Sequence, residues 1–123
     1  MIDFQNGSII KLSKAKFGDG KDVLPLLVKN EELMGVYRGL RDYVVFTNKR
    51  IISVNVQGLT GKKKDFTTLP YSKVQAFSIE TAGVLDFDSE LELWFSGLGK
   101  VRFEFTGESD IVLIGQLISQ AIM

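Results

Sequence analysis

The chain contains neither cysteine nor histidine, carries no net formal charge and has only 2 prolines. Without cysteine there is no disulfide, thiolate nucleophile or cysteine-ligated metal. Without histidine the chain lacks the commonest general base and metal ligand. The 15 basic and 15 acidic residues cancel, so no overall field attracts nucleic acid or an anionic membrane. These absences argue against an enzyme and favour a binding or structural role, with no cofactor, no metal and no nucleic-acid partner.

Chain length and apolar runs set further limits. The 123 residues suit one domain that buries about two thirds of its unfolded surface. The start has Asp3 ahead of a short apolar patch, unlike a signal peptide. The C-terminal apolar segment is interrupted by Gly115, Gln116, Ser119 and Gln120, so it is too polar and too short to cross a bilayer. We therefore expect a soluble, cytoplasmic protein.

From Glu32 onward, short apolar runs separated by Gly, Asn, Asp and Pro indicate an antiparallel sheet. The clearest pair flanks Thr47–Arg50, where Asn48 suits the left-handed conformation of a tight turn and Lys49 and Arg50 keep the tip in water. Pro70 ends one strand, because proline cannot donate to a central ladder. The pattern predicts seven strands: Leu33–Leu40, Tyr43–Thr47, Arg50–Val56, Lys63–Leu69, Val74–Glu80, Glu90–Ser96 and Lys100–Thr106.

The last two predicted strands alternate apolar and polar residues, so each has one buried face. An odd-length loop at Gly97–Gly99 puts both apolar faces on the same side. The register that follows pairs Phe95 with Val101, Leu93 with Phe103 and Trp94 with Arg102. Trp94 then lies on the exposed face beside a guanidinium, in a cation–π contact worth about 0.5–1 kcal/mol.

Both ends of the chain are predicted to contain a helix. Asp22 is expected to cap a short helix that begins at Val23, with Pro25 in its first turn. After Thr106 the apolar spacing changes to about 3.6 residues, with Ser109 as the expected N-cap. One side of this C-terminal helix carries Ile111, Ile114, Leu117, Ile118, Ala121 and Ile122. The predicted layout is a single domain with an N-terminal extension at 1–31, a sheet at 32–107 and a helix at 109–122.

Seven short antiparallel strands followed by an amphipathic helix is the element order of a pleckstrin-homology-like fold. In that mainly β fold, with some α, the helix closes one end of a bent sheet or partly open barrel. Residues 26–123 resemble the bacterial pleckstrin-homology domain family. The most specific segments are Arg41–Asp42, Phe46–Arg50, Gly58–Lys63, Pro70–Lys73, Glu80–Gly83 and Asp86–Trp94. The resemblance implies a stand-alone cytoplasmic domain, and the family is associated with ring-shaped homo-oligomers. Phosphoinositide binding by eukaryotic relatives does not transfer without their basic pocket.

Two groups of charges are candidate sites. Lys62, Lys63 and Lys64 form the only run of three like charges, and Arg38 and Arg41 are predicted near them. Each cation near an anionic surface contributes about 1 kcal/mol, so lipid or anion binding requires the five to converge. A solvated loop that protects a sheet edge is the favoured alternative, because acidic residues flank the run.

Asp86, Asp88 and Glu90 alternate like the start of a calcium loop, but leucine and glycine stand where that loop needs glycine and glutamate. Solvated carboxylates at a turn are therefore favoured, and glycosidase chemistry lacks an evident cleft. These acids, with Glu80, could instead meet Lys73 or the basic loop of a neighbouring subunit. The glycines of the 57–64 segment lack the spacing of a phosphate loop.

Three functions remain open, in descending order. The first is a non-enzymatic binding or scaffold module that self-associates into a homo-oligomer and contacts an unknown protein partner, with Trp94 and Arg102 as its candidate interface. The second is peripheral membrane or anionic-lipid binding through Arg38, Arg41 and Lys62–Lys64. The third, an enzyme, is least favoured.

Overall fold

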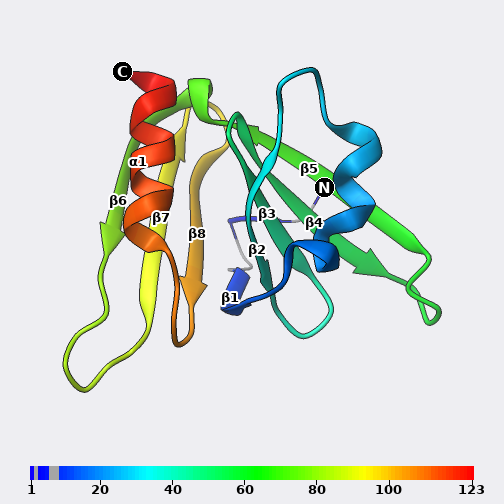
Figure 1. Cartoon of the computed structure of the whole chain (residues 1–123), viewed down its shortest axis with the longest axis horizontal. Coiled ribbons are helices and arrows are strands. Elements are labelled where there is room, and N and C mark those ends of the chain that lie inside the picture. The colour runs from blue at the N-terminus through cyan, green and yellow to red at the C-terminus, as the bar shows by residue number, and fades with distance from the viewer. Residues whose placement is uncertain (2, 6–8) are drawn as a thin grey trace.

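The computed structural model describes residues 1, 3–5 and 9–123 (Figure 1). The described residues form one eight-stranded sheet, two 3₁₀-helical segments and one α-helix. The strands are β1 (Ile9–Lys14), β2 (Leu33–Arg38), β3 (Tyr43–Thr47), β4 (Arg50–Gln57), β5 (Lys63–Pro70), β6 (Val74–Glu80), β7 (Ser89–Phe95) and β8 (Gly99–Phe105). The helical segments are η1 (Phe17–Leu26), η2 (Tyr71–Lys73) and α1 (Ile111–Ile122).

The sheet runs in the order β5-β4-β3-β2-β1-β8-β7-β6. All neighbouring strands are antiparallel except β1 and β8, which are parallel. β5 and β6 stand at the two ends without pairing to each other, so the sheet is bent but does not close into a barrel. The mainly β class and the C-terminal helix predicted from the sequence are thus confirmed.

The sheet has eight strands rather than seven, because the N-terminal segment supplies β1. β1 pairs Ser13 with Arg38 of β2 and Leu12 with Phe105 of β8, and so joins the two halves of the sheet. Its pairing register shifts between Ile9 and Leu12, and Lys11 has a φ of 60°. This bulge breaks the alternation by which a strand is read from sequence.

The first helical segment also differs from the prediction. It is a 3₁₀ helix that begins at Phe17, so Asp22 lies inside it and does not cap a helix at Val23. The Asp22 carboxylate instead accepts a hydrogen bond from the Tyr43 hydroxyl at 3.3 Å and pairs with Lys64 at 3.0 Å. These contacts fasten η1 to β3 and β5.

η1 packs closely on β2 and β3. A Cβ atom at Gly20 would lie 3.0 Å from Cγ2 of Val36 and 3.1 Å from Cγ2 of Val45, so only glycine fits this approach without movement. Val23 is fully buried in the cluster beneath η1. The remaining buried members of that cluster are Val36, Tyr43, Val45, Ile52 and Val54. β3, whose residues are all buried, is therefore covered on both faces.

The larger apolar cluster fills the opposite, concave side of the sheet beneath α1 (Figure 1). Ile111, Ile114 and Ile118 of α1 are buried in it, as the helical spacing predicts. Ala121, predicted on the same face, is exposed because it lies in the last turn. Asp110, rather than Ser109, occupies the N-cap position, and the Ser109 hydroxyl lies 2.8 Å from the Ser89 hydroxyl. No helix in the described residues is long and apolar enough to cross a membrane.

The β7–β8 register is shifted from the prediction. Phe95 pairs with Gly99 and Trp94 with Lys100, because the chain turns at residues 96–98. Gly97 has a φ of 83°, a left-handed conformation that glycine adopts without strain. The shift is an even number of residues, so the apolar faces still meet, but the pairing of Trp94 with Arg102 is wrong.

Candidate functional site

The predicted basic residues are divided between two environments. Arg38 lies 4.0 Å from Asp19 and Lys64 lies 3.0 Å from Asp22, so acidic side chains of η1 offset both cations. Arg38 also borders a shallow hollow of about 890 Å³. Its charged lining residues are Lys14, Lys16, Asp19, Arg38 and Glu108. Since both signs of charge line this hollow, it does not select an anion.

Arg41 joins the other basic residues. Its guanidinium donates to the Gly58 carbonyl and so ties the β2–β3 loop to the β4–β5 loop. Lys62 is exposed in the second loop and Lys63 at the start of β5, and neither forms an ion pair with any described residue. Three of the five predicted cations therefore meet at these loops, and two do not.

The same two loops expose apolar tips that the sequence analysis did not single out. Leu40, at the tip of the β2–β3 loop, and Leu59, in the β4–β5 loop, are fully exposed. The Arg41 hydrogen bond to Gly58 holds these loops side by side. Exposed leucines flanked by cations are suited to a lipid surface, because apolar tips enter the acyl boundary while cations remain at the headgroups.

Trp94 and Arg102 share the outer face of the β6–β8 half. Trp94 is 36% exposed, and its cross-strand neighbours are Lys100 on β8 and Ala76 on β6. Arg102 lies diagonally from it, since its direct partner is Glu92. The Arg102 side chain is held by Glu90, with Nε 2.8 Å from one carboxylate oxygen and an N–H donating to the other at 2.9 Å. The guanidinium is thus already engaged within the chain.

The acidic stretch does not converge into a metal site. Asp86 accepts a hydrogen bond from the Asp88 backbone at 3.0 Å, whereas Glu90 lies in β7 and binds Arg102. Among the described residues, no three His, Cys, Asp or Glu side chains are arranged to hold a metal ion. Their carboxylates therefore act separately.

An apolar groove runs between the edge strand β6 and α1. Its volume is about 510 Å³, and it is lined by Phe77, Ile79, Val112, Gly115, Gln116, Ser119 and Gln120. β6 pairs only with β7 among the described strands, so one side of its backbone is free to accept another strand. The sequence signal for this site was weak, because a neutral strand looks the same at an edge as in the middle of a sheet.

The loop that follows β6 is the most exposed apolar segment next to this edge. Val84 and Leu85 at its tip are 90% and 95% exposed, and Phe87 is 66% exposed. The Gly83 N–H donates to the Asp86 carbonyl at 2.7 Å and closes the tip into a turn. In Figure 1 this loop extends beyond β6, away from the core. We call residues 81–88 the β6–β7 finger.

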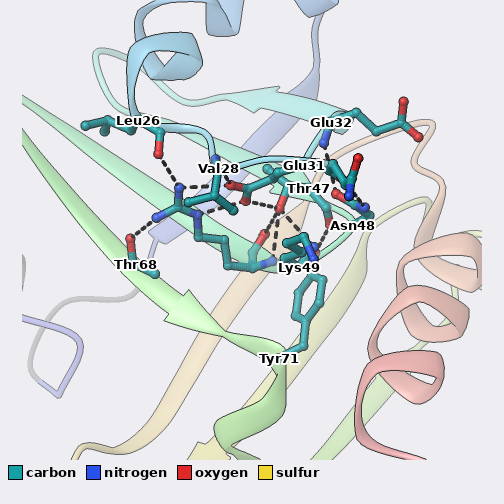
Figure 2. A network of polar contacts seen from close by, with 11 residues as sticks. Leu26, Val28, Glu31, Glu32, Thr47, Asn48, Lys49, Thr68 and Tyr71 are labelled. Carbon is teal, nitrogen blue, oxygen red and sulfur yellow. Dashed lines mark hydrogen bonds and ion pairs between the residues drawn. The ribbon is translucent and has the colours of Figure 1, made fainter.

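A buried polar network (Figure 2) lies at the β3–β4 turn, at the other end of these strands from the β2–β3 and β4–β5 loops (Figure 1). Glu31, whose side chain is 0% exposed, accepts hydrogen bonds from Arg50 at 2.8 and 3.0 Å and from Thr47 at 2.7 Å. The Val28 N–H donates to it at 3.0 Å. Burial alone raises the pKa of Glu31, but the hydrogen bonds from Arg50 and Thr47 outweigh it and hold the pKa below its usual value.

Arg50 and Tyr71 extend the network. Arg50 also donates to the Thr68 hydroxyl at 3.0 Å and to the Leu26 carbonyl at 2.7 Å, and the Tyr71 hydroxyl donates to the Thr47 carbonyl at 2.7 Å. These bonds fasten the segment after η1 to the β3–β4 hairpin (Figure 2). The sequence analysis placed Arg50 at a solvated tip and missed this role.

The bent open sheet and its terminal helix define a pleckstrin-homology-like domain. The model of the bacterial PH domain family matches residues 3–122, and the chain belongs to that family. It is 37% identical to the uncharacterized protein YjqA of Bacillus subtilis (strain 168), over 99% of this chain and 98% of that protein. It is 33% identical to the uncharacterized protein YozO of the same organism, over 80% of this chain and 85% of that protein.

Solved structures agree with this assignment. A DUF1696 family protein with a pleckstrin-homology domain from Shewanella loihica PV-4 has a TM-score of 0.75 and 35% identity, covering 95% of this chain and 100% of that chain. A pleckstrin homology domain from Shewanella amazonensis SB2B has a TM-score of 0.63 and 37% identity, covering 96% and 93%. Sequence and fold therefore agree on the family, and both Bacillus subtilis relatives are uncharacterized proteins.

Proposed function

We propose that this chain is a non-enzymatic, cytoplasmic binding module that self-associates into a homo-oligomer and presents the assembled surface to a protein partner. The observation that carries the proposal is the unpaired β6 edge, bordered by the apolar groove and by the exposed β6–β7 finger. Unprotected edges and contiguous exposed apolar surface are unusual in monomers, because both promote association. Trp94 lies next to β6 on the outer face and remains a candidate contact.

Sedimentation equilibrium across micromolar concentrations tests this proposal. A self-associating chain gives a mass above 13.7 kDa that rises with concentration or stays at a multiple of that value. A mass of one copy throughout the range rejects self-association. Weak contacts repeated in an assembly would also raise partner affinity through effective concentration, so partner binding should follow the oligomer.

A second candidate function, anionic-lipid binding, is supported by the paired Leu40 and Leu59 tips beside Arg41, Lys62 and Lys63. The test is co-sedimentation with vesicles of phosphatidylserine and phosphatidylcholine, compared with vesicles of phosphatidylcholine alone. Binding that requires phosphatidylserine should weaken in L40A/L59A and in K62A/K63A, because each pair removes one part of the contact. Equal sedimentation of all variants rejects lipid binding at these loops.

A further inference from the structure

We propose that the outer side of η1 lies on an anionic membrane beside the Leu40 and Leu59 tips, and that it recognises the charge of the membrane rather than one headgroup. This inference rests on the second candidate function, anionic-lipid binding, and adds a segment that neither loop contains. We call the exposed apolar and basic side chains of residues 16–29 the η1 face. Its apolar members are Phe17, Leu24, Leu26 and Val28, and its cations are Lys16, Lys21 and Lys29.

The η1 face places several large apolar side chains in water within one short segment. Its four apolar members are between 45% and 58% exposed. The inner side of η1 is nevertheless fixed in the core, by the close approach of Gly20 to β2 and β3 and by the fully buried Val23. The segment is therefore held in place while its outer side remains in contact with solvent. Exposed apolar side chains gathered in this way mark a surface that binds a partner or a membrane.

Charge selects the occupant of the η1 face. Within residues 16–29 the acidic side chains are Asp19 and Asp22, and they lie 4.0 and 3.0 Å from Arg38 and Lys64 of the sheet. The three lysines of the η1 face form no ion pair with any described residue. The unpaired charges of this segment are thus all positive. An anionic surface complements them, and the apolar side chains between them can enter the acyl boundary.

The two acids of η1 also place it beside the loops that carry the exposed leucines. Arg38 ends β2 just before the loop with Leu40, and Lys64 lies in β5 just after the loop with Leu59. Because the acids contact these two cations, η1 rests against the strand ends from which both tips project. In Figure 1 η1 and α1 lie at opposite sides of the molecule. The η1 face and the two loops therefore share the side away from α1.

The β6–β7 finger provides an internal comparison. Its Val84 and Leu85 are more exposed than any apolar member of the η1 face. The charges beside them are Asp86 and Asp88, which form no ion pair with any described residue. Carboxylates are repelled by anionic headgroups, so the finger is unsuited to the same membrane. Unpaired cations, and not apolar exposure alone, distinguish the η1 face.

The hollow next to η1 does not suit a single polyanionic headgroup. Lys16 and Arg38 help to line it, but so do Asp19 and Glu108. Attraction then depends on the density of negative charge at the membrane surface. We expect vesicles that contain phosphatidylserine and vesicles that contain phosphatidylglycerol to bind equally when their charge is equal.

A tryptophan on the η1 face tests the contact directly. The chain has one tryptophan, Trp94, which lies in β7 on the other half of the sheet. The L24W/W94F variant moves this single reporter to η1. Its emission should shift to shorter wavelength on vesicles of phosphatidylserine and phosphatidylcholine, and lipids brominated in the acyl chain should quench it. The wild-type protein is the control, because the emission of Trp94 should neither shift nor be quenched.

Co-sedimentation with the same vesicles measures how much the η1 face contributes. Lys21→Ala and Leu24→Ala should each lower the partition coefficient about fivefold, because one removes a cation from the headgroups and the other removes apolar surface from the acyl boundary. The matched controls are Lys73→Ala, at an exposed and unpaired lysine of η2, and Met123→Ala, at the exposed residue after α1. Both controls should bind as the wild type does. Thermal melting and sedimentation equilibrium check that each variant keeps its fold and mass.

The outcomes separate this contact from the candidate function on which it rests. If the wild-type protein does not bind vesicles that contain phosphatidylserine, both are rejected, and the η1 face is left to an acidic segment of another protein. If L40A/L59A weakens binding while the emission of L24W/W94F does not move, the η1 contact is rejected and binding at the loops stands. A preference of more than about tenfold for one headgroup at equal charge rejects recognition by charge alone.

Discussion

The two halves of the sheet are built differently. Strands β2–β4 are buried on both faces, by η1 on one side and the main core on the other, and Glu31 and Arg50 clamp their end. Strands β6–β8 are buried on one face only, and their outer face carries ion pairs and Trp94 in contact with solvent. The first half is therefore the more deeply buried, whereas the second half leaves its outer face in solvent and ends the sheet at β6.

Each half contains a glutamate–arginine ion pair, and these two pairs differ in how far they are exposed to solvent. Glu31 and Arg50 have side chains 0% and 17% exposed, whereas Glu90 and Arg102 are 21% and 41% exposed. Glu31→Ala leaves Arg50 without its partner in a buried setting and should lower the free energy of unfolding by about 3–5 kcal/mol. Glu90→Ala should cost about 1 kcal/mol or less, because solvent screens that pair. Urea unfolding measures both, and equal losses would contradict the division into halves.

Truncation of a buried and of an exposed apolar side chain should also lower the free energy of unfolding by different amounts, with a smaller difference than for the ion pairs. Val23→Ala removes fully buried methyl groups beneath η1 and should cost about 1.5–3 kcal/mol. Val112→Ala, on the exposed side of α1, should stay within about 0.5 kcal/mol in a monomeric preparation. Urea unfolding of both variants provides the comparison. If Val23→Ala cost no more than Val112→Ala, η1 would be a loosely attached cover rather than part of the core.

The sequence predicted the elements whose signal is local. The apolar runs of Tyr43–Thr47 and Arg50–Gln57, and the isoleucine spacing of α1, are readable within a few residues. β1 was missed because the bulge at Lys11 hides its alternation. η1 was misplaced because a 3₁₀ helix lacks the 3.6-residue period used to find helices.

The candidate sites depended more on tertiary contacts. Glu31 reaches Arg50 across 19 residues and Thr47 across 16, a relation that leaves no pattern in the sequence. The basic residues were identified from the sequence. Their ion pairs with Asp19 and Asp22 were not, because the position of η1, which carries both acids, was not predicted. The β6 edge was equally hidden, because β1 inserts between the halves and thereby fixes which strands end the sheet.

Acid should weaken the clamped half in a defined pH range. The pKa of Glu31 lies below its ordinary 4.5 in the folded chain, so its carboxylate stabilises the fold above about pH 4.5 and this contribution is lost as the pH falls through the folded pKa. The stability difference between wild type and Glu31→Gln should therefore be constant from pH 6 to 8 and shrink in acid. Thermal melting at each pH measures it. A difference that stayed constant down to pH 3 would show that Glu31 contributes by packing rather than by charge.

The smallest expected difference in stability is between two surface lysines. It tests whether the two halves of the sheet also differ in their surface ion pairs. Lys64 pairs with Asp22 at 3.0 Å and fastens η1, whereas Lys100 lies 3.9 Å from Glu92 on the open face. Lys64→Ala should lower the free energy of unfolding by about 1 kcal/mol, and Lys100→Ala by about 0.2 kcal/mol. Repeating the urea titrations in 1 M salt should reduce both losses, because screening weakens exposed pairs most. If Lys100→Ala cost as much as Lys64→Ala, the stabilising role of η1 would be limited to its buried Val23 contact and would not extend to its charged rim.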